Sequence, residues 1–105
     1  TAERNSDCDA TRITFIQDDF GAIAVRYPEL VGHVDMAFID SGWPIMVKEP
    51  CMRLRHYRLA QQWCKPGGYV YVDDMLEEWE GRAEIAAECT MLPTDRGLSV
   101  WRKPT

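Results

Sequence analysis

The sequence predicts an α/β fold, with a doubly wound, mostly parallel sheet and a C-terminal antiparallel hairpin. Two runs, 34–39 and 69–72, consist mainly of apolar residues that favour strands, and each is followed by acidic residues. Helical patterns separate such runs, which is the order typical of parallel strands. A glycine-containing turn between two further strand patterns, 90–94 and 98–102, predicts the hairpin. The 105 residues are enough for one domain, 1–105.

The first part of the chain predicts a strand and a short helix. Residues 1–11 are charged and lack periodicity, so we expect an irregular lead-in. Residues 12–17 carry β-branched and aromatic side chains and predict a first strand with acids at its end. Apolar residues at helical spacing between 20 and 30 predict a helix, which Pro28 should shorten or break.

The middle of the chain predicts a loop followed by a better-defined helix. Residues 41–50 contain glycine and two prolines, which favour irregular structure, and residues 51–64 have helical periodicity. The residues expected on the buried side of this helix are Met52, Leu54, Leu59, Ala60 and Trp63. Four basic residues crowd its middle, and we expect a solvated face there, with a phosphate or partner site as the alternative. They are Arg53, Arg55, His56 and Arg58.

The last part of the chain is arranged around the strand 69–72. Residues 65–68 include a proline and two glycines, which should stop the preceding helix. The strand itself shows no polar alternation, so it should be buried on both faces, as in a parallel sheet covered by helices. Residues 76–89 then predict an amphipathic helix despite Gly81, and residues 95–97 form the turn of the hairpin.

Acidic residues follow the predicted strands at the edge where parallel strands end. Asp40 follows the run 34–39, and Asp73 and Asp74 follow the run 69–72. Ligands in open α/β sheets bind beyond the carboxyl ends of the strands. Three carboxylates gathered at one edge repel one another unless something positive binds there. The sequence therefore predicts a cation site at these acids.

Composition and charge narrow the classes of partner. The formal charge of −5 argues against a general nucleic-acid binder, because phosphate-tracking surfaces usually have a basic excess. No apolar run approaches the roughly 18 residues that a membrane span needs, and the polar N-terminus does not resemble a signal peptide. We therefore expect a cytoplasmic protein without a membrane partner. The cysteines lack metal-binding spacing and should be reduced packing residues. They are Cys8, Cys51, Cys64 and Cys89.

Four segments occur in an order that carries a family resemblance: 14–19 (TFIQDD), 35–42 (DMAFIDSG), 65–74 (KPGGYVYVDD) and 97–103 (GLSVWRK). Together they resemble the C-terminal half of a class I S-adenosylmethionine-dependent methyltransferase. In that family they would be the third, fourth, fifth and seventh strands, the last of them antiparallel. The resemblance implies a Rossmann-like fold and S-adenosylmethionine as the cofactor.

The subgroup that the chain resembles most is the small-molecule O-methyltransferases that use a divalent cation. In that subgroup, acids at the ends of the fourth and fifth strands hold magnesium against substrate hydroxyls. The resemblance therefore implies that Asp40, Asp73 and Asp74 bind Mg²⁺, with Asp40 also counted as catalytic. A hard cation prefers oxygen ligands and lowers the pKa of a bound hydroxyl. The implied activity is metal-assisted methyl transfer to a hydroxyl of a small-molecule acceptor.

Lys48 is a candidate catalytic base, with His56 as the alternative. The resemblance also implies residues that contact the cofactor. Asp19 matches the family position that contacts the adenine amine, and Asp18 is the shifted alternative; both acids have a helix N-cap or turn role as the competing interpretation. Trp43 should stack on the adenine or the acceptor unless it is a core aromatic residue.

The chain departs from the family pattern where the cofactor would bind. It contains no GxGxG turn, and only a polar lead-in precedes the strand predicted at 12–17. We expect the first two strands of the fold to come from another chain or a missing segment, or the remaining strands to form a rearranged sheet. The first residue is Thr rather than Met, which agrees with a processed product or a fragment. This polypeptide alone should bind the cofactor weakly.

Two other interpretations compete with the enzyme. The first is a non-catalytic methyltransferase-like module that binds a partner through Arg53, Arg55 and Arg58. The second is a response-regulator receiver, because Asp40 ends a strand and Pro44 follows four residues later. A receiver also needs an acidic pair well before this aspartate and a lysine at the end of its fifth strand. Here the earlier acidic pair is too close and the lysine is missing, so we rank this interpretation last.

Overall fold

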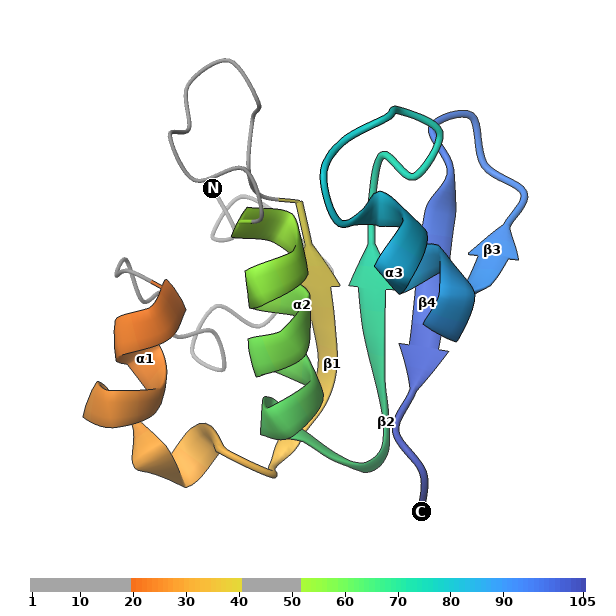
Figure 1. Cartoon of the computed structure of the whole chain (residues 1–105). Helices are drawn as coiled ribbons and strands as arrows, with labels where there is room; N and C mark the ends of the chain where they lie inside the picture. Colours follow the sequence, from red (N-terminus) through yellow and green to blue (C-terminus); the bar gives the residue numbers. More distant parts are fainter. Residues whose placement is uncertain (1–19, 41–51) are drawn as a thin grey trace, which may run out of the picture.

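In the computed structural model of the chain, the structure describes residues 20–40 and 52–105. They form a four-stranded mixed sheet with helices packed on one face (Figure 1). The strand order is β1-β2-β4-β3, in which β1 and β2 are parallel and the other neighbours are antiparallel. The strands are β1 (Val34–Ile39), β2 (Cys64–Val72), β3 (Thr90–Leu92) and β4 (Leu98–Arg102).

The α/β class and the C-terminal antiparallel hairpin are confirmed. The expectation of a mostly parallel sheet is wrong for the described strands, because one of their three pairings is parallel and two are antiparallel. The difference arises because β4 enters the sheet between β2 and β3. The strand predicted at 12–17 and the loop predicted at 41–50 lie outside the described residues.

The helix predicted between 20 and 30 is broken, as expected. It consists of α1 (Phe20–Arg26) and a 3₁₀ helix, η3 (Pro28–Leu30). Pro28 has no backbone N–H and therefore cannot continue the hydrogen bonding of an α-helix. The last α-helical bond joins the Tyr27 N–H to the Ile23 carbonyl at 2.7 Å.

The second helix, α2 (Met52–Trp63), packs on the sheet with a face that was only partly predicted. Ala60 and Trp63 are buried, as expected. Tyr57 is also fully buried, and its hydroxyl donates a hydrogen bond to Glu88 Oε1 at 3.0 Å. Arg53 is buried as well, so the prediction of a solvated basic face is wrong at this position. A buried tyrosine hydroxyl needs a partner such as Glu88, which no local sequence pattern supplies.

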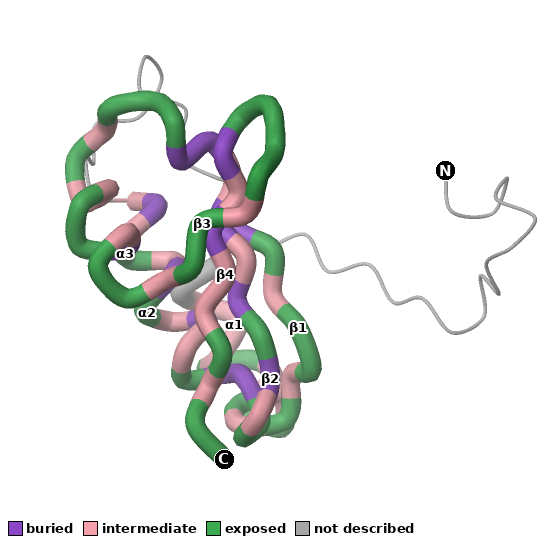
Figure 2. Tube along the Cα trace, turned by 90° about the vertical axis from the view of Figure 1, so that its right-hand side faces the viewer, coloured by how far each residue is buried: buried purple, intermediate pink, exposed green. Residues whose placement is uncertain are grey.

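The core lies between the helices and one face of the sheet. Ile39, Val70 and Val72 are buried beneath α2 and α3 (Arg82–Glu88). On the opposite face Met36 is 58% exposed and Phe38 is 56% exposed. The prediction that strand 69–72 is buried on both faces is therefore wrong: exposure alternates along β2 (Figure 2). Tyrosines at alternate positions are apolar enough to hide this alternation in the sequence.

The third helix is shorter than predicted. It begins at Arg82 rather than at Leu76, because Gly81 adopts a left-handed φ of 90° and precedes the first helical turn. A side chain at Gly81 would lie 2.9 Å from Leu54 Cβ, so glycine allows this turn to approach α2 closely. Residues 73–81 form an irregular connection. Its Trp79 indole N–H donates to the Asp74 carbonyl at 2.9 Å.

The first part of β2 bulges out of the parallel pairing. Val34 lies opposite Cys64 and Met36 lies opposite Tyr69, so residues 65–68 of β2 correspond to the single residue Asp35 on β1. The predicted helix stop is thus correct, and this proline-glycine segment forms the start of β2. Gly68 is buried directly against the β1 backbone.

The residues after β4 are tied to this bulge. The Lys103 N–H donates to the Gly68 carbonyl at 2.8 Å, and the Gly67 N–H donates to the Lys103 carbonyl at 3.0 Å. Lys103 Nζ also donates to the Cys64 carbonyl at 2.8 Å. The C-terminus therefore lies at the end of the sheet opposite the carboxyl ends of β1 and β2 (Figure 1).

Cys64 and Cys89 are free thiols, as predicted, and Cys8 and Cys51 lie outside the described residues. Burial raises the pKa of both thiols, which favours packing over reactivity. Within the described ranges, no helix has the length and apolar character to cross a membrane.

Helices α2 and α3 are tied together by a cluster around Glu88. Arg58 Nη2 lies 2.7 Å from Glu88 Oε2, and Arg58 Nη1 and Gln61 Nε2 donate to Glu88 Oε1 at 2.8 and 3.1 Å. The hydrogen bond from Arg58 lowers the pKa of Glu88 from 4.5 to about 2, and those from Gln61 and Tyr57 add to it.

We expect this cluster to make the free energy of unfolding depend on pH. Because the Glu88 pKa is lowered on folding, the stabilisation is complete above pH 4.5 and is lost as the pH falls towards 2. The arginine and glutamate side chains are 43% and 35% exposed, so solvent screening should limit the effect to about 1 kcal/mol. Urea unfolding at a series of pH values should show this extra loss in the wild type and in a Glu80→Gln control. The Glu88→Gln variant should lack this extra loss of stability at low pH. An equal loss in Glu88→Gln would contradict its assignment to Glu88.

Candidate functional site

The three acids predicted to converge do lie together. Asp40, Asp73 and Asp74 each offer a carboxylate oxygen, and these oxygens lie within 4.8 Å of one another. The Asp73 N–H donates a hydrogen bond to the Ile39 carbonyl at 3.1 Å. This bond continues the backbone pairing of β1 and β2 just beyond the end of β2. The parallel pairing thus brings together acids that are far apart in the sequence.

The Asp74 carboxylate is held inward by its backbone. Asp74 has a left-handed φ of 59°, and its side chain is only 13% exposed. Aspartate tolerates this conformation better than most residues. The Asp74 carbonyl accepts hydrogen bonds from the Trp79 indole and from the Glu77 N–H. These bonds fix the turn that directs Asp74 towards the other acids.

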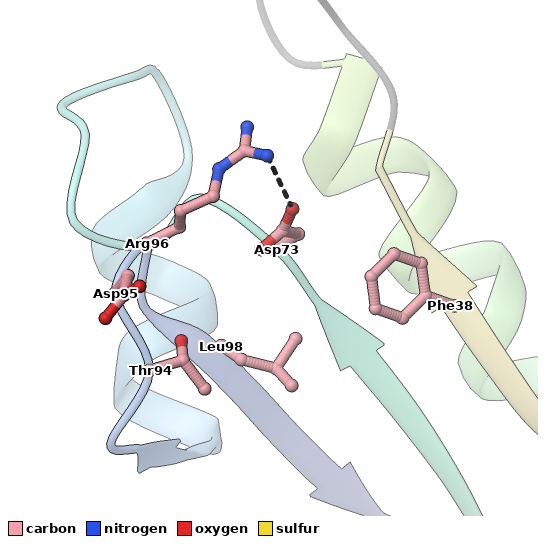
Figure 3. Close-up of a pocket in the computed structure, with 6 residues that line it drawn as sticks. All are labelled: Phe38, Asp73, Thr94, Asp95, Arg96 and Leu98. Carbon is pink, nitrogen blue, oxygen red and sulfur yellow. Dashed lines mark ion pairs between the residues drawn. The ribbon is translucent and has the colours of Figure 1, made fainter.

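An arginine from the hairpin, which no sequence motif marks as a site residue, lies against the acids. Arg96 Nε donates to Asp74 Oδ1 at 2.7 Å, and Arg96 Nη2 donates to Asp74 Oδ2 at 2.8 Å. Arg96 Nη1 lies 3.9 Å from Asp73 Oδ2 (Figure 3). The hydrogen bonds to Asp74 raise the pKa of Arg96, and the charges of Asp74 and Asp73 add to this effect. The only signal in the sequence was a basic residue next to the glycine of the turn.

The hairpin loop that carries Arg96 is fixed by backbone contacts. The Leu76 N–H donates to the Arg96 carbonyl at 3.2 Å, and the Met75 N–H donates to the Gly97 carbonyl at 2.8 Å. Gly97 has a φ of 77°, and a side chain there would lie 2.8 Å from the Leu76 nitrogen. This close approach requires glycine. The loop therefore holds the Arg96 backbone beside the end of β2.

A second arginine supports the site from the helical side. Arg53 Nη1 donates to the Asp73 carbonyl at 3.1 Å, and its guanidinium lies 5.0 Å from the centre of the Trp79 ring. Arg53 therefore stabilises the chain around the acids rather than forming a solvated face. Arg58 is engaged with Glu88. Arg53 and Arg58, which belong to the partner-binding alternative, thus contact other parts of the chain.

A hollow of about 290 Å³ opens beside Asp73 on the face of the sheet that carries Phe38 (Figure 3). Its lining combines an aromatic ring, an aliphatic side chain and polar groups from the hairpin. The residues that line it are Phe38, Asp73, Thr94, Asp95, Arg96 and Leu98.

Oxygen donors at this spacing fit a magnesium ion only in part. Ligand oxygens bound to Mg²⁺ lie about 2.0–2.1 Å from the metal, so opposite ligands are roughly 4 Å apart. A carboxylate oxygen of Asp40 lies within 4.8 Å of one of Asp73, which is close to that spacing. Both oxygens of Asp74 already accept hydrogen bonds from Arg96. The residues therefore fit a site in which the carboxylates of Asp40 and Asp73 would be the main ligands, while the Asp74 carboxylate is paired with Arg96.

Four of the other predicted site residues lie outside the described residues: Lys48, Asp18, Asp19 and Trp43. His56, the alternative base, lies on α2, one residue before the buried Tyr57.

Comparison with protein-family models finds no match for the chain. Comparison with curated proteins also finds no match.

Proposed function

We propose that this chain is the acceptor- and metal-binding part of an S-adenosylmethionine-dependent methyltransferase that acts on a hydroxyl of a small molecule. The observation that supports this function is the convergence of Asp40, Asp73 and Asp74 at the carboxyl ends of the parallel pair. The antiparallel β4 beside β2 agrees with the resemblance to the family's last strand. The complete sheet would then be Rossmann-like and doubly wound, with its remaining strands supplied by another chain or segment.

The positions of the residues suggest which of them would bind the metal ion and which would bind the acceptor. Asp40 and Asp73 would hold Mg²⁺, and Phe38 together with the hairpin residues would bind the acceptor in the adjoining hollow. A bound magnesium ion would lower the pKa of the acceptor hydroxyl and so favour its nucleophilic form at neutral pH. The protein's own contribution is to orient this hydroxyl and to keep it at a fixed position.

S-adenosylmethionine itself does not fit this chain alone. The sequence has no GxGxG turn to hold the methionine part of the cofactor. We therefore assign cofactor binding mainly to the completing half, with Asp18, Asp19 and Trp43 as the residues that this chain would contribute.

Magnesium titration tests the metal part of the proposal. We expect Asp40→Asn and Asp73→Asn each to weaken Mg²⁺ binding about tenfold or more, because each removes one anionic ligand and its charge. Asp35→Asn is the matched control, since Asp35 lies on β1 near the end opposite to the one that Asp40 follows, and it pairs with Lys65 at 2.6 Å. Isothermal titration calorimetry should show unchanged binding in this control. Equal weakening in all three variants would contradict a specific site.

Methyl transfer is tested separately, on the longest natural polypeptide that contains this chain. Labelled S-adenosylmethionine and a catechol probe should give a methylated product in the presence of Mg²⁺, and Asp40→Asn should abolish it. A protein that binds Mg²⁺ but never transfers the methyl group to diol or phenol probes would overturn the enzymatic proposal.

One observation favours a second candidate, a non-catalytic methyltransferase-like module. The Arg96–Asp74 pair already neutralises one of the acids with good geometry, so it would stabilise a scaffold without any metal. This candidate requires that neither Mg²⁺ nor S-adenosylmethionine binds, and the same titrations distinguish it from the enzyme.

A further inference from the structure

Asp74 has a nearly buried carboxylate, which needs a positive partner. Its side chain is 13% exposed, and an unpaired charge in such surroundings is strongly unfavourable. Arg96 supplies the partner through two hydrogen bonds, one to each carboxylate oxygen. This fork geometry is the one in which arginine binds carboxylates best.

The same guanidinium also stands close to the second acid of the cluster. Arg96 Nη1 lies 3.9 Å from Asp73 Oδ2, and the carboxylate oxygens of Asp73 and Asp74 lie within 4.8 Å of each other and of Asp40. Arg96 therefore provides positive charge at the place where the three carboxylates would share a divalent cation. A carboxylate oxygen can accept a hydrogen bond and ligate a metal ion at the same time, but the guanidinium charge would repel a divalent cation bound beside it.

Arg96 can leave Asp74 without any change in the fold. Its carbonyl and that of Gly97 are held by the N–H groups of Leu76 and Met75. Its side chain is 66% exposed, so the guanidinium has access to solvent. Rotation about side-chain bonds is fast in exposed residues and is enough to free both oxygens of Asp74.

We propose that Arg96 is an internal cation that competes with a divalent metal ion at the three carboxylates, so that the Arg96–Asp74 pair and a bound metal ion weaken each other. The inference rests on the metal-binding part of the proposed function. With Arg96 in place, Asp40 and Asp73 form a weak two-carboxylate site. When Arg96 turns outward, Asp74 becomes the third ligand. Arg96 thus sets the metal concentration at which the site fills.

Titration of the full chain with magnesium chloride tests this competition. Arg96→Gln should bind Mg²⁺ about tenfold more tightly than the wild type, because the metal no longer displaces a competing cation. Arg96→Lys keeps the charge but loses the fork, so its affinity should lie between the two. Arg102→Gln is the matched control, since it removes the same charge from the far end of β4, where Arg102 lies 5.8 Å from the Tyr69 ring centre. Its affinity should not change.

Thermal unfolding gives a second readout. Without Mg²⁺, Arg96→Gln should melt below the wild type because Asp74 has lost its partner, and saturating Mg²⁺ should raise the melting temperature of this variant more than that of the wild type. Adding Asp40→Asn to Arg96→Gln should remove the gain in affinity.

The inference is overturned if Arg96→Gln binds Mg²⁺ no better than the wild type, if no variant binds it, or if Arg102→Gln gains as much. If Arg96→Gln binds Mg²⁺ more tightly but the protein does not transfer a methyl group, the proposed enzymatic function is overturned and the competition between Arg96 and the metal ion is retained. Methyl transfer without that gain would overturn the competition alone.

Discussion

Replacing Gly68 with alanine should lower the free energy of unfolding by about 3 kcal/mol, the upper part of the range for overpacked sites. An added Cβ would lie 2.9 Å from the Asp35 carbonyl oxygen, 3.0 Å from that of Lys65 and 3.1 Å from that of Val34. All three neighbours are backbone atoms, so no side chain can rotate away to make room. The strain would fall on the pairing of β1 with β2, which brings Asp40 and Asp73 together.

Gly32→Ala is the control for the Gly68 variant. Gly32 has a φ of 80°, but no atom lies within 4 Å of an added Cβ. Alanine there should cost only the backbone strain of a left-handed residue, about 1 kcal/mol. Urea unfolding with an unchanged m-value would measure both losses. Equal costs at the two positions would contradict the close approach at Gly68.

Replacing Ile39 with alanine should cost about 3 kcal/mol, whereas Phe38→Ala should cost less than about 1 kcal/mol. These neighbours on β1 point to opposite faces of the sheet: Ile39 is 3% exposed and Phe38 is 56% exposed. Ile39 directly precedes Asp40, and its truncation leaves a cavity in the core beside the site. Truncation of Phe38 instead changes the lining of the hollow beside Asp73.

Chemical denaturation separates these two outcomes. Phe38→Ala should keep the stability of the fold and, if the hollow binds the acceptor, should weaken acceptor binding in the completed enzyme. A large loss of stability in Phe38→Ala would mean that the open face of β1 is covered, and it would contradict the one-sided core seen in the described residues.

Local sequence patterns predicted much of the fold because the elements have clear beginnings and ends. Pro28 ends α1, the segment 65–68 ends α2, and Gly97 closes the hairpin. The convergence of Asp40 with Asp73 was also predictable, because the carboxyl ends of adjacent parallel strands necessarily share an edge.

What the sequence did not predict depends on contacts between distant residues. Gly81 ends an irregular connection rather than lying within a helix, because α3 packs closely on Leu54 of α2. Arg53 can be buried because its guanidinium donates a hydrogen bond to the Asp73 carbonyl and packs against the Trp79 ring. The pairing of Arg96 with Asp74 requires the hairpin to fold back over the end of β2, which no periodicity or spacing indicates.

The anchoring of Lys103 has a practical consequence for biosensor work. Because its backbone and its ammonium group fasten the tail at the bulge of β2, a linker fused after Thr105 would emerge at the end of the sheet away from the acids (Figure 1). A chip-bound protein attached in this way would present its carboxylates to the flowing analyte, unobstructed by the attachment surface.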